Sequence, residues 1–113
     1  MKVQLQPLRI PSGWTVSFND GLYEVDPPGE LVSEQDRSVF FKEDLLQLRH
    51  QRHNRVLDVG WYPSGDLATG QYVLTVYAND CLGPKLHSMA TVNRVTLVAE
   101  IERLLVAIAD GAL

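Results

Sequence analysis

The sequence predicts an α+β fold, in which an antiparallel sheet of about five strands packs against one C-terminal amphipathic helix. The first observation is the run Val56–Tyr77, VLDVGWYPSGDLATGQYVLTVY, in which two alternating segments flank a loop rich in glycine. Alternation with a period of two is typical of a strand with two different faces. The second observation is a change of period after residue 93, where apolar residues recur at helical intervals.

The central hairpin is predicted from alternation on both sides of its loop. The two faces of each segment are Leu57, Val59 and Trp61 against Asp58, Gly60 and Tyr62, then Tyr72, Leu74 and Val76 against Val73, Thr75 and Tyr77. The connecting loop, PSGDLATG, contains proline and glycine residues that supply turn geometry. Two β-rich segments joined by such a loop indicate a hairpin, which we place at the centre of the sheet.

Three shorter strands are expected near the N-terminus. Lys2–Ile10 alternates but contains Pro7, which cannot donate to a β-ladder, so this is an edge strand or one interrupted at the proline. Trp14–Asn19 alternates regularly and predicts the second strand. The sequence Asn-Asp-Gly at 19–21 is a strong turn signal, so we expect Leu22–Val25 to return as a short third strand.

The region between these strands and the hairpin is less regular. Two prolines at 27 and 28 end regular structure, and the polar run Glu30–Ser38 predicts an exposed connection. Val39–Arg49 fits both helical and strand spacing, and we predict a helical turn that runs into an extended segment. Gln51–Asn54 is expected to turn the chain into the hairpin.

The C-terminal part of the chain is expected to add a last strand and then the helix. Leu86–Thr91 alternates, and Asn93 is the expected N-cap of the helix that follows. The apolar stripe of this helix comprises Val95, Val98, Ile101, Leu105 and Ile108, widened by Leu97 and Leu104. Gly111 is expected to end the helix. Burying five or six such side chains is worth about 10 kcal/mol before entropy is subtracted, so we assign the helix to the core rather than to a partner.

Length and composition predict one globular domain over residues 1–113. The single cysteine, Cys81, excludes an internal disulfide and fits a reducing compartment. The N-terminus does not resemble a signal peptide, and no apolar run approaches the roughly 18 residues of a membrane span. We therefore expect a cytoplasmic protein without a membrane partner.

Charge is distributed unevenly along the chain, whose net charge is −4. Eight acids lie between residues 20 and 44, against two bases, and the sign reverses in the short basic turn Arg49–Arg55. An acidic face favours basic partners and repels nucleic acid. The other interpretation is an ordinary solvated surface with one basic turn.

The sequence carries no pattern that specifies catalysis, a cofactor or a metal. Cys81 and His87 lack the signature of a nucleophile with its base, and His50 and His53 lie among arginines that repel a cation. Asp58 and Asp66 lie near one end of the hairpin and could in principle act as paired carboxylates, although structural hydrogen bonding is the commoner role. What remains is an acidic flank beside exposed aromatic residues, which is typical of a protein-binding surface.

Two segments resemble bacterial immunity proteins encoded beside polymorphic toxins, including contact-dependent growth inhibition toxins. They are KEDLLQLRH at 42–50 and NRVLDVGWYPSGDLATGQYVLTV at 54–76, with the sharpest similarity between Asp44 and Leu74. The resemblance implies a cytoplasmic antitoxin without enzymatic activity, metal or cofactor. Its partner would be the C-terminal toxic domain of a cognate protein, often a nuclease, whose active site or substrate surface it would occlude.

On this resemblance, acidic and aromatic side chains are the expected contacts with the toxin. They are Glu24, Asp26, Glu43, Asp44, Asp58 and Asp66 as charged contacts, with Trp61 and Tyr62 as aromatic anchors. Alternation also permits Trp61 to lie in the core. Two other functions stay open: a small non-catalytic regulatory or scaffold subunit with a resident partner, and a hydrolase that uses Asp58 and Asp66. Whether the domain dimerises is also open.

Overall fold

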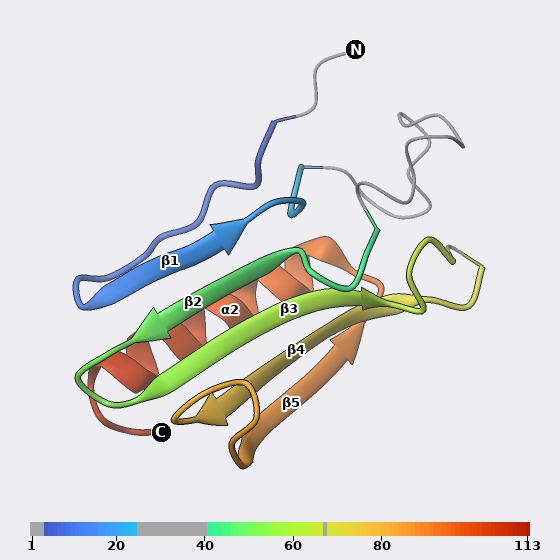
Figure 1. The fold of residues 1–113 in the computed structure, drawn as a ribbon. Helices are drawn as coiled ribbons and strands as arrows, with labels where there is room; N and C mark the ends of the chain where they lie inside the picture. Colours follow the sequence, from blue (N-terminus) through green and yellow to red (C-terminus); the bar gives the residue numbers. More distant parts are fainter. Residues whose placement is uncertain (1–3, 25–40, 67) are drawn as a thin grey trace.

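Five strands form one antiparallel sheet in the order β1-β2-β3-β4-β5 (Figure 1). The computed structural model describes residues 4–24, 41–66 and 68–113. The strands are β1 (Trp14–Asn19), β2 (Leu46–His50), β3 (Arg55–Tyr62), β4 (Gln71–Ala78) and β5 (Lys85–Thr91), and the helix is α2 (Arg94–Ala109). The predicted α+β architecture is therefore confirmed.

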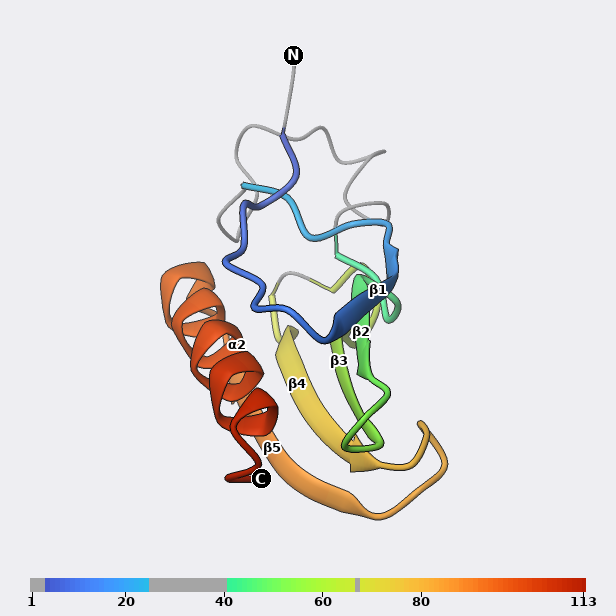
Figure 2. The same cartoon turned by 90° about the vertical axis from the view of Figure 1, so that its left-hand side faces the viewer.

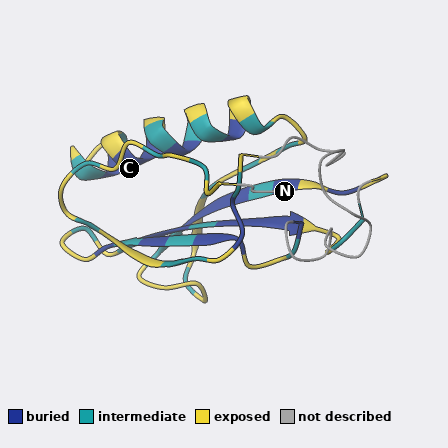
Figure 3. Cartoon of the chain, turned by 90° about the horizontal axis from the view of Figure 1, so that it is seen from above, coloured by how far each residue is buried: buried dark blue, intermediate teal, exposed yellow. Residues whose placement is uncertain are grey.

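The sheet and α2 form two layers with the hydrophobic core between them (Figures 2 and 3). Alternate residues of β2, β3 and β4 point toward the helix and are buried: Leu46, Leu48, Leu57, Val59, Trp61, Tyr72, Leu74 and Val76. From α2 the core receives Leu97, Ile101, Leu104, Leu105 and Ile108. Among the described residues no helix lies over the opposite face of the sheet, and we call it the open face.

The central hairpin has the predicted strands and faces. β3 and β4 pair along their whole length, with Leu57 opposite Val76 and Trp61 opposite Tyr72. Tyr72 is buried on the helix side, as alternation predicts. The register therefore sets Asp58 opposite Thr75 on the open face.

The helix begins and ends where the sequence predicts. The side chain of Asn93 accepts a hydrogen bond from the N–H of Thr96 at 2.9 Å, which satisfies a free donor of the first turn. At the other end Gly111 adopts φ +78°, and the N–H of Ala112 reaches back to the carbonyl of Ala107 at 2.8 Å, as in a Schellman motif. Two expected members of the stripe are not in the core: Val95 is 68 % exposed, and Val98 is only partly buried.

The strand predicted at Lys2–Ile10 is wrong for the residues that the structure describes. Only Leu5 forms a β-bridge there, with Tyr23. Farther along the segment, the N–H of Arg9 donates to Glu102 of the helix at 2.7 Å. The predicted strand Leu22–Val25 is likewise reduced to that single bridge, and Val25 lies outside the described residues.

The partner of β1 is β2, rather than the segment that follows the Asn-Asp-Gly turn. Asn19 pairs with Leu46, and the N–H groups of Asp20 and Gly21 both donate to the carbonyl of Leu45. Long-range pairing therefore replaces the expected local hairpin.

The extended half of the Val39–Arg49 prediction is confirmed as β2, but the helical half is wrong over residues 41–45. The N–H of Trp61 donates to the carbonyl of Lys42, and the N–H of Leu45 donates to that of Val59. These bonds tie the segment to β3, and residues 41–45 form bends rather than a helical turn. Residues 39–40 and the predicted connection Glu30–Ser38 lie outside the described residues. The turn at Gln51–Asn54 and the last strand, β5, are confirmed.

Candidate functional site: the open face of the sheet

Asp58 lies at the centre of the open face, in the middle of β3. Its cross-strand neighbours are Gln47 on β2 and Thr75 on β4, and Thr75 is in turn opposite Ser88 on β5. The amide of Gln47 donates to Oδ1 of Asp58 at 3.4 Å. The row therefore consists of polar side chains, whereas the rows that face α2 are apolar.

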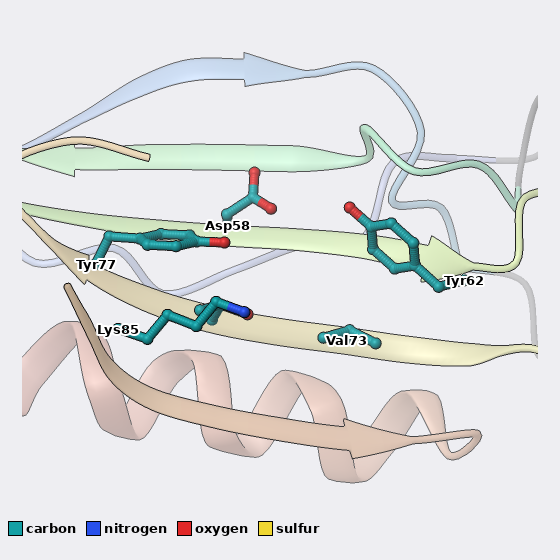
Figure 4. A pocket seen from close by; sticks show the side chains of 6 residues that line it. Asp58, Tyr62, Val73, Tyr77 and Lys85 are labelled. Atoms are coloured by element: carbon teal, nitrogen blue, oxygen red, sulfur yellow. The ribbon is translucent and has the colours of Figure 1, made fainter. Parts of the chain in front are cut away.

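A hollow of about 300 Å³ opens beside Asp58 on this face. It is lined by Asp58, Tyr62, Val73, Thr75, Tyr77 and Lys85. Figure 4 shows the hydroxyl groups of Tyr62 and Tyr77 pointing toward Asp58 from opposite sides. Thr75 lines the hollow and is only 5 % exposed, although no helix of the described residues covers this face. The hollow thus presents one carboxylate between two phenols.

Partial burial in this hollow changes the acidity of Asp58. Desolvation raises the pKa of its carboxyl group, and the nearby charge of Asp44 raises that pKa further. The hydrogen bond from Gln47 acts in the opposite direction and lowers the pKa. A cation that contacts Asp58 would stabilise its ionised form, and Lys85 already supplies one positive charge to the lining of the hollow.

The acidic end of the open face is built around Tyr62. Its hydroxyl donates to the backbone carbonyl of Glu43 at 3.4 Å. Desolvation raises the pKa of Tyr62, and the negative charges of Asp58, Glu43 and Asp44 raise it further. Three carboxylates therefore act on one phenol, which indicates that they converge at this end of the face.

The connection between β4 and β5 borders the other end of the hollow. This connection extends from the sheet on the side away from α2 (Figure 2). Arg49 donates to the backbone carbonyl of Asn79 at 2.6 Å, and the amide of Gln47 lies 3.0 Å from Sγ of Cys81. Burial raises the pKa of the Cys81 thiol, and the charge of Asp58 contributes to that increase.

Four of the eight predicted contact residues come together on the open face: Glu43, Asp44, Asp58 and Tyr62. Glu24 is exposed, beside the bridge between Leu5 and Tyr23, and no contact of its side chain links it to the hollow. Asp26 lies outside the described residues.

Trp61 is not an aromatic anchor, because its side chain is fully buried. Its ring packs edge-on against Phe41 and Tyr72, with centroid distances of 5.0 and 4.9 Å. Its indole N–H donates to the backbone carbonyl of Asp66 at 2.8 Å. The core alternative that alternation left open for Trp61 is the one realised.

Asp66 is committed to the loop of the hairpin. Its carboxylate accepts hydrogen bonds from the N–H groups of Ala68 and Thr69 at 3.0 Å, and from the Thr69 hydroxyl at 2.5 Å. The bonds from Thr69 hold the pKa of Asp66 below its usual value. The carboxylate of Asp66 is thus hydrogen-bonded within the hairpin loop, whereas the carboxylate of Asp58 accepts a hydrogen bond from Gln47 on the open face.

Sequence analysis missed the residues that complete the hollow. Thr75, Tyr77 and Lys85 come from β4 and β5, and they meet Asp58 only through the register of the sheet. Thr75 and Tyr77 share the parity that alternation assigns to the face away from the core, so a correct register would have found them. Lys85 follows an irregularity in the pairing of β4 with β5, which no local pattern predicts.

The basic turn forms a separate cluster at the far end of β2. His50 is buried against Trp14 and His53, and its Nδ1 accepts a hydrogen bond from the N–H of His53 at 3.3 Å. Burial lowers the pKa of His50, with a smaller effect from the charges of His53 and Arg52. Across the described parts of the chain, no three potential ligands are grouped so that they could hold a metal ion.

The chain matches no known protein family, curated protein or solved structure. Within the described residues, no helix combines the length and the apolar composition needed to cross a membrane.

Proposed function

We propose that this protein is an immunity protein that binds a cognate toxin domain and neutralises it by covering its active site or substrate surface. The observation that carries the proposal is the convergence of Glu43, Asp44 and Asp58 on Tyr62, at one end of an open sheet face. Three carboxylates beside a phenol offer charged contacts and an amphipathic ring to a basic surface.

The rigidity of the site supports recognition rather than turnover. Asp58 and Tyr62 project from β3, a central strand bonded on both sides, so little ordering is required when a partner binds. The alternative function, a hydrolase that uses Asp58 and Asp66, has less support, because the carboxylate of Asp66 is hydrogen-bonded within its own loop. A nuclease with a basic substrate cleft is the class of toxin that this acidic face fits best.

The proposal is tested with the toxic domain that the neighbouring gene should encode. Co-expression of the two proteins should restore growth of cells that the toxin alone kills. Purified together, they should form a stable complex in which the toxin is inactive. A neighbouring gene without a toxic product, combined with a stable complex with a resident protein, would replace the proposal with the regulatory-subunit alternative.

The contribution of the open face is tested with charge-neutral variants. We expect a variant that combines Glu43→Gln, Asp44→Asn and Asp58→Asn to bind the toxin at least about tenfold more weakly. The matched control is Asp110→Asn, which removes one exposed carboxylate at the end of α2, on the helix layer. Equal affinity of the triple variant and the wild type would show that another surface binds the toxin.

A further inference from the structure

Leu82 is 95 % exposed at the tip of the connection between β4 and β5. Its exposed fraction is the largest among the exposed large hydrophobic residues that the structure describes; the next is Val95, at 68 %. Single exposed apolar residues are common on protein surfaces and need no explanation by themselves. What distinguishes Leu82 is its loop, which hydrogen bonds hold in shape and tie to the open face.

The loop is held in one conformation by its own hydrogen bonds. Asp80 accepts from the N–H of Leu82 through Oδ1 and from the N–H of Gly83 through its backbone carbonyl, both at 2.9 Å. The N–H of Ala78 donates to the carbonyl of Pro84 at 2.9 Å and closes the base of the loop. A side chain that makes almost no contact is thus carried by a well-bonded backbone.

Further bonds fix the loop to the sheet. The N–H of Asn79 donates to the carbonyl of Asn54 at 2.8 Å, and its own carbonyl accepts from the Arg49 guanidinium at 2.6 Å. Cys81, the residue before Leu82, lies 3.0 Å from the amide of Gln47, which is also the hydrogen-bond donor to Asp58. One glutamine side chain therefore bridges the loop and the central carboxylate of the open face.

We infer that Leu82 is the apolar anchor of the toxin-binding face, so that the toxin presents an apolar pocket beside the basic groups that meet Asp58. This inference rests on the proposed function. A leucine on a preorganised loop gains contact area on binding and loses little conformational freedom. Interfaces usually combine an apolar core with a polar rim, and a few residues supply most of the affinity.

The test is the affinity of the toxic domain for Leu82→Ala. We expect the dissociation constant to rise about tenfold, mainly through faster dissociation. The melting temperature should not change, because the Leu82 side chain contributes almost nothing to the core. Val95→Ala is the matched control: it truncates an exposed apolar side chain on α2, on the opposite layer, and should leave affinity unchanged.

The outcomes separate this inference from the function on which it rests. Equal affinity of Leu82→Ala and the wild type, with the complex intact, would overturn the role of Leu82 and leave the immunity function standing. Equal losses in Leu82→Ala and Val95→Ala would also overturn it. The absence of any complex with the wild-type protein would remove both proposals.

Discussion

Two glycines are required for different physical reasons, and the difference can be measured. A Cβ on Gly60 would lie 2.0 Å from the backbone carbonyl oxygen of Glu43, which cannot move without disturbing the pairing beside β3. Gly111 has open space around it but adopts φ +78°, which strains any residue with a side chain.

We therefore predict that Gly60→Ala lowers the free energy of unfolding by about 3 kcal/mol and Gly111→Ala by about 1 kcal/mol. Urea denaturation followed by tryptophan fluorescence measures both. Equal costs for the two variants would contradict the assignment of a steric cause at one site and a conformational cause at the other.

Asp58 is expected to lower the stability of the domain while serving the proposed interface. Burial raises its folded-state pKa above the ordinary value of 3.8, so stability falls as pH rises through the window that begins near that value. Asp58→Asn keeps an oxygen acceptor for Gln47 and removes the charge. The variant should be about 0.5 kcal/mol more stable than the wild type at pH 7, since partial exposure screens the penalty.

The gain from Asp58→Asn should disappear at pH values below 3.8, where the wild-type carboxyl is protonated in both folded and unfolded states. Paired urea titrations at the two pH values check the sign. A variant that is less stable than the wild type at pH 7 would show that the ionised carboxylate is stabilised by contacts that outweigh its burial.

The fate of individual residues shows where sequence reasoning stops. Alternation assigns Trp61 and Asp58 to opposite faces correctly, because side-chain direction in a strand depends only on local parity. It cannot tell that the Trp61 ring fills the core against Phe41, which comes from an irregular segment outside the hairpin. Nor does alternation show that the carboxylate of Asp66 accepts a hydrogen bond from Thr69, since that bond depends on the conformation of the loop.

At the scale of elements, Glu100 of α2 joins the helix to the edge strand β5. Its carboxylate lies 2.9 Å from Nε2 of His87, and Arg103 donates two further bonds at 2.6 and 2.9 Å. The bond from Arg103 is the largest of the effects that hold the pKa of Glu100 below its ordinary value of 4.5. Its stabilising effect is thus present above pH 4.5 and is lost as pH falls through the lower folded-state pKa.

We predict that Glu100→Gln lowers the free energy of unfolding by about 0.5 to 1 kcal/mol at pH 7. Amide hydrogen exchange in β5 should accelerate more than in β3, because β5 pairs on one side only. The difference between variant and wild type should vanish in acid, below the pKa of Glu100. Uniform acceleration of exchange across the sheet would indicate general destabilisation instead of a local tie.

Elements with a strong local period are predicted well, and elements fixed by distant partners are not. The hairpin β3–β4 and the helix α2 have their own periodicity, turn and caps. The segment around Leu5 alternates as well, yet it forms one bridge because Arg9 bonds to α2 across the molecule. Residues 41–45 have helical spacing but form bends that backbone hydrogen bonds tie to β3.

At the scale of the whole molecule, the position of α2 leaves one face of the sheet for the proposed partner. Since α2 covers one face of the sheet, the other face stays open and carries the polar residues of the central strands (Figures 2 and 4). Net charge of −4 then adds a long-range field of the sign that attracts a basic partner. The fold thus places the hydrophobic core on one side of the sheet and the proposed binding face on the other.

Long-range attraction and the short-range apolar contact should have different kinetic signatures in the complex with the toxin. Charge steering acts on encounter, so raising the salt concentration from about 0.05 to about 0.5 M should lower the association rate constant about tenfold. The dissociation rate constant should change much less. Leu82→Ala should have the same salt dependence as the wild type, because it removes no charge. The triple variant Glu43→Gln, Asp44→Asn and Asp58→Asn should show a weaker salt dependence.

Surface plasmon resonance at several salt concentrations measures both rate constants. A salt-independent association rate would mean that the acidic end of the open face does not face the toxin, and parallel salt slopes for the charge variant and the wild type would lead to the same conclusion.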